Sequence, residues 1–248
     1  MNGQQWQNAK KFTEMSAVVS YTLVRSRRKT VAIYVRDGEV EVRAPLRVPK
    51  SEIERFVSEK ESWILKIRAK QLARAEKKKF FAVDYGSRIF FRGKQYEITQ
   101  NEEYFGFDGK NFFVPPNFSP QEIKFACIQA YKTLAKAHIS ERAAFFSAQM
   151  GVTPSAVKIS GAKKRWGSCS SRIGKKSVAR NNLNFSWRLM MADDRVIDYV
   201  TVHELAHLKE MNHSARFWAI VENVLPDFRE RNVLLRELQN RLSDENWE

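Results

Sequence analysis

The feature that most constrains the fold of this chain is a His-Glu-x-x-His pattern within an amphipathic stretch near its C-terminal end. His203, Glu204 and His207 stand in the segment VTVHELAHL, where Val200 and Leu205 supply apolar residues on a helical period. Residues four apart on an α-helix lie one turn apart on the same face, so both imidazoles can reach one Zn²⁺ while Glu204 projects beside them. The pattern predicts a helix that carries two zinc ligands and a general base.

A third ligand requires this helix to end soon after the second histidine. Catalytic zinc sites usually take three protein ligands and leave one position for water. In a continuous helix His213 would point about 240° away from the preceding ligand. We expect the chain to reverse at Asn212, which tolerates the left-handed conformation, with Ser214 as the N-cap of the next helix. A carboxylate of that helix, Glu222 or Asp227, is the alternative third ligand, with His213 then supporting the ligands from outside.

Such a site would run hydrolysis through a zinc-bound water. The metal lowers the pKa of that water toward about 7, and Glu204 takes its proton and passes it to the leaving group. The oxyanion needs further donors, for which Arg165, Ser168 and Asn182 are the substrate-binding candidates. Cys169 as a ligand or nucleophile is an alternative. The alternative for the whole site is a helix with surface or core histidines and no metal.

Charge is distributed unevenly along the sequence. The chain has 43 Lys and Arg against 28 Asp and Glu, a net charge of +15. Residues 159–192 hold eight Lys or Arg and no Asp or Glu, whereas the histidine segment that follows is acidic. A basic segment can attract nucleic acid or a nucleotide, and it can also be a solvated surface. If it binds polyanions, Lys163, Lys164, Lys175 and Lys176 are the residues we expect to contribute.

The hydropathy and the cysteines of the sequence indicate where the protein is located. No apolar run approaches the roughly 20 residues that a membrane span needs, and the start of the sequence lacks the apolar core of a signal peptide. Cys127 and Cys169 form no paired motif, so both are interpreted as reduced thiols. His138, alone in a helical stretch, is interpreted as structural. We predict a cytoplasmic protein without a membrane span.

The periodicity of the sequence predicts an α+β fold. Helices are expected from Ser51 to the lysines at 77–79, from the capping box of Ser119 and Glu122 to Met150, and in the last 55 or so residues. Strands and helices are grouped rather than strictly alternating, which favours the α+β class. We expect a small antiparallel meander, with a turn at Asp37-Gly38, before the first helix. The expected strands are 18–24, 30–35, 40–43, 88–91, 95–99, 111–114, 156–160 and 183–187. The predicted regions are 1–117, which is β-rich with a long helix, and 118–248, with a boundary near residue 117.

Several motifs together resemble the YgjP-like metallopeptidase family, whose members are related to WLM and SprT-like zinc proteases. The motifs are RWGSCSS at 165–171, NFSWRL at 184–189, DYVTVHELAHL at 198–208, NHS at 212–214 with Phe217-Trp218, and in the N-terminal half RRKT at 27–30, VRAP at 42–45 and the helix at 53–64. The resemblance implies a minimal zincin-like domain with zinc on His203, His207 and His213 and the base at Glu204. The stretch 172–182 departs from the family pattern because it is longer and more basic.

Three functions remain open at this point. The leading hypothesis is a zinc-dependent hydrolase, specifically a metallopeptidase that acts on a peptide or protein substrate. One alternative is a metal-dependent phosphoester or nucleotide hydrolase, which the basic segment 159–192 favours. The other is a zinc-stabilised nucleic-acid or protein-binding adaptor. For the RWGSC motif, a wall of the active site competes with simple core packing of Trp166 and Trp187.

Overall fold

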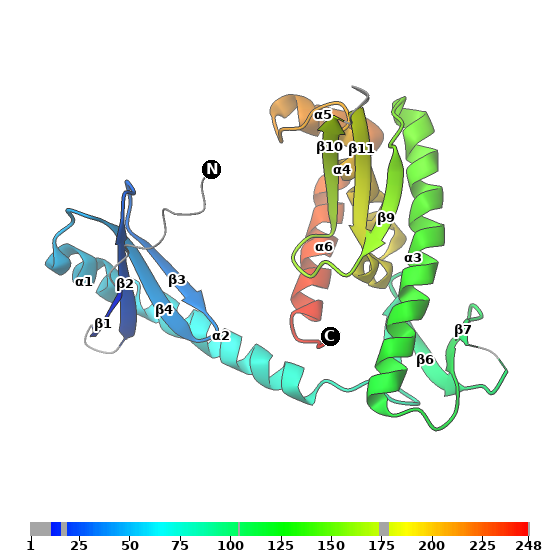
Figure 1. Ribbon diagram of the computed structural model, residues 1–248, viewed down its shortest axis with the longest axis horizontal. Coiled ribbons are helices and arrows are strands. Elements are labelled where there is room, and N and C mark those ends of the chain that lie inside the picture. The colour runs from blue at the N-terminus through cyan, green and yellow to red at the C-terminus, as the bar shows by residue number, and fades with distance from the viewer. Residues whose placement is uncertain (1–10, 16–18, 104, 174–178, 248) are drawn as a thin grey trace. The chain divides into compact units, whose positions relative to one another are not determined.

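The computed structural model describes residues 11–15, 19–103, 105–173 and 179–247. The chain forms two compact units, Met1–Phe80 and Phe81–Glu248, which are treated separately below (Figure 1). Both units combine small sheets with helices, so the predicted α+β class is confirmed. None of the helices in the described ranges combines the length and hydropathy that crossing a membrane requires.

The first unit is a four-stranded sheet followed by two helices. Its strands are β1 (Lys11–Met15), β2 (Ser20–Ser26), β3 (Ala32–Arg36) and β4 (Glu39–Pro45), in the order β1-β2-β4-β3. The helices are α1 (Lys50–Glu59) and α2 (Glu61–Phe80). Alternate residues of β2 and β4 form its core with apolar residues of both helices: Tyr21, Leu23, Val40, Val42, Ala44, Ile53, Val57 and Ile64.

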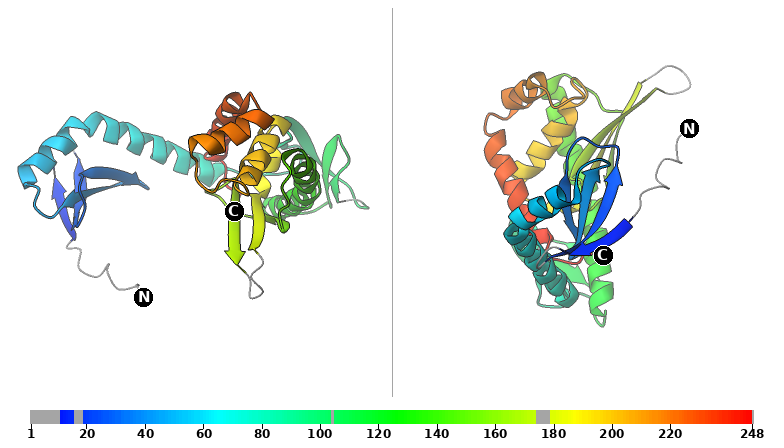
Figure 2. Two further views of the ribbon diagram at one scale, coloured as in Figure 1. Left: turned by 90° about the horizontal axis from the view of Figure 1, so that it is seen from above. Right: turned by 90° about the vertical axis from the view of Figure 1, so that its left-hand side faces the viewer.

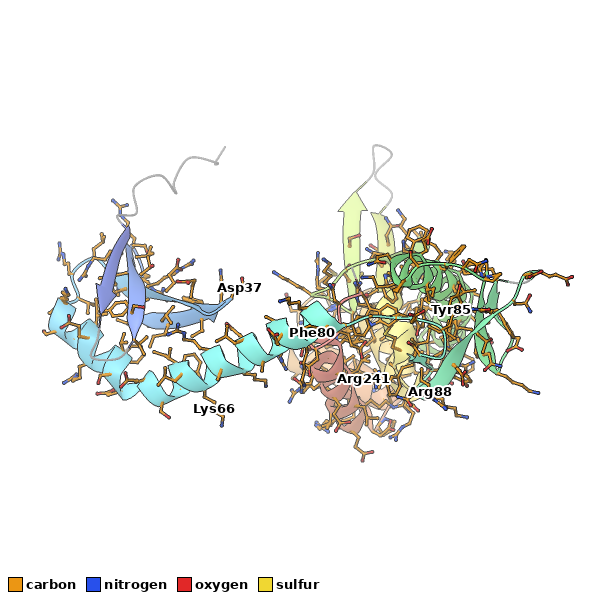
Figure 3. The ribbon with its side chains drawn as sticks, turned by 90° about the horizontal axis from the view of Figure 1, so that it is seen from below. Asp37, Lys66, Phe80, Tyr85, Arg88 and Arg241 are labelled. Atoms are coloured by element: carbon orange, nitrogen blue, oxygen red, sulfur yellow. The ribbon has the colours of Figure 1, made fainter. Side chains whose placement is uncertain are left out.

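Three local predictions for this unit have different outcomes. The turn at Asp37-Gly38 is confirmed: both residues have positive φ, 51° and 81°, as a tight hairpin between β3 and β4 requires, and Figure 3 shows Asp37 at its tip. The antiparallel meander is wrong, because β2 pairs in parallel with β4 and not with β3. The connection from β2 to β3 therefore crosses β4, a topology that strand periodicity alone does not encode. The predicted single helix is broken at Lys60 into α1 and α2.

The second unit contains two sheets and most of the helices. One sheet has the order β5-β6-β8-β7 and the other β10-β11-β9. The elements are β5 (Arg88–Phe91), β6 (Lys94–Gln100), β7 (Gly106–Phe107), β8 (Asn111–Val114), α3 (Pro120–Met150), β9 (Ala156–Ser160), β10 (Gly167–Ile173), β11 (Ala179–Ser186), the 3₁₀ helix η1 (Trp187–Met191), α4 (Asp194–Ala206), α5 (Ala215–Val224) and α6 (Phe228–Leu242).

Helices α3 and α4 pack against each other and against the outer strands of the second sheet. Helix α3 contacts β9, and α4 contacts β10 (Figures 1 and 2). The capping box that opens α3 is present as predicted: Ser119 accepts from the backbone N–H of Glu122, and the Glu122 carboxylate accepts from the N–H of Ser119. Helix α3 ends at Gly151 in the left-handed conformation, φ 62°, which glycine adopts without steric cost.

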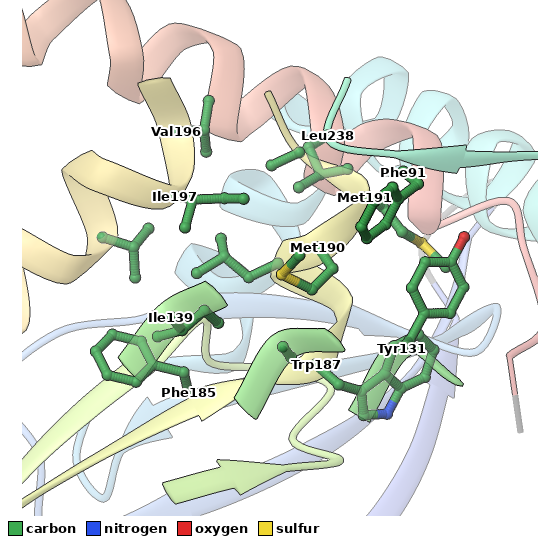
Figure 4. Close-up of a cluster of buried hydrophobic side chains, with 14 of the residues drawn as sticks. Phe91, Tyr131, Ile139, Phe185, Trp187, Met190, Met191, Val196, Ile197 and Leu238 are labelled. Atoms are coloured by element: carbon green, nitrogen blue, oxygen red, sulfur yellow. The ribbon is translucent and has the colours of Figure 1, made fainter. Parts of the chain in front are cut away.

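A single hydrophobic core spans the second unit, from Val83 to Trp247. Figure 4 shows part of it, with Tyr131 of α3 lying against Trp187. The two rings stack with 5.4 Å between their centroids, within the range of roughly 4.5–7 Å that is typical of aromatic pairs. Strands β5 to β8 contribute Ile89, Phe91 and other residues to this same core. The chain divides into its two compact units between Phe80 and Phe81, and the boundary near residue 117 between a β-rich region and a hydrolase domain stays a prediction.

Candidate metal centre

Helix α4 positions the first two histidines. Asp193 caps its first turn by accepting from the N–H of Arg195. Most residues of the helix are buried, and His203 lies in its last turn. His207 follows directly as the C-cap, with helical backbone angles of φ −63° and ψ −17°. The rings of these two histidines lie 5.1 Å apart between centroids and nearly perpendicular, at 84°. The predicted pair of imidazoles on one helical face is present.

The chain reverses after α4 and brings His213 back to the same place. Ser214 caps α5 by accepting from the N–H of Phe217, as predicted. Asn212 is not among the described residues with positive φ, so the expected left-handed turn at that position is wrong and the chain turns with ordinary backbone angles. The Nε2 atoms of His213 and His203 lie 3.0 Å apart.

The three histidines fit one metal ion. Their potential ligand atoms all lie within 4.8 Å of one another, and tetrahedral zinc with bonds near 2.0–2.1 Å would hold such nitrogens roughly 3.3 Å apart. Burial, and then the neighbouring imidazoles, lower the pKa of His203 to about 3, which keeps that ring in the neutral form that binds metals. His207 donates through Nδ1 to the carbonyl oxygen of Glu210 at 3.2 Å, which leaves its Nε2 as the atom that could bind a metal.

The carboxylates considered as alternative ligands are engaged elsewhere. Glu222 pairs with Arg229 at 2.8 Å. Asp227 pairs with Arg231 at 2.8 Å and with Arg195 at 2.9 Å. Among the described residues, the group able to hold a metal consists of the three histidines alone.

Glu204 is buried against strand β10. Its side chain is only 5% exposed, and burial raises its pKa to about 7, an effect opposed by a hydrogen bond from the N–H of Cys169 and by the charge of Arg165. A Cβ atom on Gly167 would lie 2.5 Å from both Cγ and Oε1 of Glu204. Glycine at this position is therefore what allows the carboxylate to lie beside the strand.

The three substrate-binding candidates differ in whether they line the cavity at this centre. Arg165 lines a cavity of about 390 Å³ together with His203, Glu204 and His213. Ser168 pairs with Asn184 across β10 and β11, and Asn182 lies on the central strand opposite Ser170; neither is among the residues that line the cavity. The lysines at 175 and 176 lie outside the described residues.

Other cavity residues were not singled out from the sequence. Tyr199 of α4, Trp218 of α5, and Asn232 and Leu235 of α6 also line it. The position of Tyr199 one turn before His203 is a signal that could have identified it. The α6 residues carry no such signal, because their place depends on how α6 packs against α4.

The two tryptophans, Cys169 and His138 lie in different environments. Trp166 is half-buried and lines the cavity, whereas Trp187 is 2% exposed and belongs to the core. The active-site wall therefore applies to Trp166, and core packing applies to Trp187. Cys169 is not part of the histidine group, and burial raises its thiol pKa. His138 lies 3.6 Å from Asp194, far in sequence from the histidine group, in agreement with a structural role.

The fold and these residues define a candidate metal-dependent hydrolase. A sequence model described as YgjP-like, metallopeptidase domain, matches residues 29–238. The chain therefore belongs to the YgjP-like family of metallopeptidase domains.

The crystal structure of the metallopeptidase zymogen of Pyrococcus abyssi abylysin is similar at 22% identity and a TM-score of 0.32, over 44% of this chain and 97% of that chain. No curated protein matched the sequence.

Proposed function

We propose that this protein is a zinc-dependent metallopeptidase whose C-terminal region is a zincin-like domain. His203, His207 and His213 hold the metal and Glu204 is the general base. The observation that carries the proposal is the convergence of the three imidazoles, with the Nε2 atoms of His203 and His213 at 3.0 Å, next to a buried carboxylate. Family membership supports the same activity.

The residues of the chain divide the work of hydrolysis. A bound Zn²⁺ would lower the pKa of a water molecule and polarise the scissile carbonyl. Glu204, held beside the ligands, accepts a proton from the attacking water and delivers it to the leaving amine. Arg165 is the substrate-binding candidate that we retain as a donor to the oxyanion, because it lines the cavity that also contains Glu204.

Strand β10 supports a peptide as the substrate. It is an outer strand of its sheet, and the N–H of Cys169 on this strand reaches the carboxylate of Glu204. An extended peptide can pair with such an edge through backbone hydrogen bonds. That arrangement would bring a scissile bond next to the general base.

The other two hypotheses are less well supported. A structural zinc site in an adaptor gives no reason for a buried carboxylate beside the histidines, because burying a carboxylate costs free energy. Hydrolysis of a phosphoester or nucleotide is favoured by the exposed residues Lys164 and Arg165 near the site, but these two cations are also compatible with a peptide. Nucleic-acid binding through residues 159–192 remains a proposal that rests on the same exposed cations.

Matched activity panels test the proposal. Purified protein supplied with zinc is assayed for metal content, for cleavage of a peptide panel and for phosphate release from nucleotides and phosphoesters. We expect peptide cleavage that stops with a chelator, returns with zinc, and is lost in Glu204→Gln with metal still bound. Phosphate release with the same dependences, and no peptide cleavage, would overturn the assignment in favour of the phosphoester hydrolase.

A further inference from the structure

We infer that the cavity beside Glu204 is a specificity pocket for one large apolar side chain, aromatic or long aliphatic, next to the scissile bond. The inference rests on the proposed peptidase function. The cavity measures about 390 Å³, within the range of roughly 300–1,000 Å³ typical of pockets that enclose small ligands. It is large enough to take a single bulky side chain.

Helix α4 forms one wall of this pocket. Tyr199 and Val200 line it together with His203 and Glu204, and each precedes one of the latter by four residues. Four residues rise about 6 Å along a helix, which is close to the length of a large side chain. Along this wall the lining therefore extends about 6 Å from the catalytic turn, a length that suits a side chain of the residue being cleaved.

Three half-buried apolar side chains form other parts of the wall. Trp166 precedes β10, Trp218 comes from α5 and Leu235 from α6. The Trp218 ring is held by stacking on Phe228 at 5.3 Å and 17°. It also lies 5.9 Å from the ring of His203 between centroids. The same indole thus borders both the metal ligands and the pocket, and it offers an apolar face where a substrate side chain would be desolvated.

The charges around the pocket disfavour basic side chains. Arg165 lines it, and the charge of Arg236 is near enough to lower the pKa of Tyr199 against the larger effect of burial. Glu204 is the acidic residue in the lining, and it is committed to proton transfer. A Lys or Arg side chain of a substrate would therefore be placed beside cations without a carboxylate to pair with.

Asn232 is the neutral polar residue of the lining. Its side chain makes no hydrogen bond to any other residue in the described part of the chain. An amide there tolerates an apolar side chain and can bond a polar tip such as a phenolic hydroxyl. A carboxylate of the same shape would reverse the preference toward cations, so Asn232 is the position at which the specificity can be changed.

The test combines ligand binding with cleavage. Zinc-loaded protein is titrated with N-acetyl amino-acid amides of Phe, Leu, Ala and Lys by ligand-observed NMR, and kcat/KM is measured on peptides varied at one residue beside the cleaved bond. We expect Phe and Leu to bind and react at least tenfold better than Ala or Lys. Asn232→Asp should improve Lys relative to Phe by about tenfold or more.

Helix α6 also supplies a matched pair of variants. Leu235→Arg should abolish the preference for Phe, whereas Val233→Arg, at a position 52% exposed and outside the lining, should leave it unchanged. Leu235→Ala provides a milder change if the charged variant does not fold, and should lower the Phe preference. Binding or cleavage indifferent to the side chain overturns the pocket. Selective binding of the Phe amide without cleavage of any peptide overturns the peptidase function and leaves the pocket supported.

Discussion

Gly167 and Glu204 are in such close contact that a Cβ atom on the glycine would lie 2.5 Å from Oε1 of the glutamate. Real Cβ atoms do not approach other heavy atoms so closely, so the glutamate or the strand would have to move. Gly167 begins β10, and the glutamate belongs to α4. The contact therefore fixes the distance between the strand that we propose binds the peptide and the helix that carries the base.

Gly167→Ala should accordingly displace Glu204 and lower kcat/KM by about a hundredfold or more, since a misplacement of 1 Å can cost that much. The destabilisation should be about 1–3 kcal/mol, typical of overpacking. Zinc content and kcat/KM report the two effects separately, and we expect zinc to stay bound. Gly161→Ala is the control, because its added Cβ would approach nothing nearer than Nε1 of Trp187 at 3.9 Å. Equal activity of both variants would contradict the positioning role.

His213 is the proposed ligand whose assignment depends most on tertiary structure. His213→Ala should weaken zinc binding by more than roughly 100-fold, because even the loss of a group that only supports a ligand costs 10–100-fold. Glu222→Ala should leave zinc affinity unchanged, since that carboxylate pairs with Arg229 at 2.8 Å. Competition titrations with a zinc chelator measure both constants. The reverse result would favour the carboxylate as the third ligand.

Local signals in the sequence predict some elements well. The capping box at Ser119, the turn at Asp37-Gly38 and the N-cap at Ser214 are read within a few residues, and the structure contains all of them. The same holds for the pair of histidines on α4, which follows from helix geometry. These features depend on short-range sterics and hydrogen bonds, so a single sequence suffices.

Features that depend on long-range packing were missed. Strand β10 is not among the expected strands, because GSCSSRI at 167–173 has neither apolar alternation nor β-branched residues until its last position. The strand exists through pairing with β11, in a polar edge position that hydrophobic periodicity does not mark. Asn232 and Leu235 reach the cavity through the packing of α6 against α4, for which no local pattern exists.

The ion pair between Arg92 and Asp194 should make a pH-dependent contribution to stability. A hydrogen bond from Arg92 lowers the pKa of Asp194 in the folded protein. Its contribution is therefore fully present above the unfolded value near 3.9 and is lost as pH falls through the lower folded pKa. The side chains are 43% and 47% exposed, so we expect no more than about 1 kcal/mol.

Denaturant unfolding of the wild type and Asp194→Asn at several pH values measures this contribution. The difference between the two proteins should be constant near neutral pH and should shrink as pH falls below about 4. His138 and Arg142 also face Asp194, so Arg92→Gln is measured in parallel to isolate the pair. A difference that grows on acidification would contradict the assigned direction of the pKa shift.

Trp247 should be a major contributor to the stability of the second unit. It is 5% exposed, and its ring lies 5.3 Å from that of Phe81, 5.9 Å from Tyr131 and 6.1 Å from Trp187. Trp247→Ala should lower the free energy of unfolding by about 3–5 kcal/mol, as large aromatic deletions in cores do. Phe125→Ala, at a position 64% exposed on α3, should change it by no more than about 0.5 kcal/mol. Calorimetric melting of both variants decides the matter: if they lose equal stability, the C-terminal residues do not belong to the core.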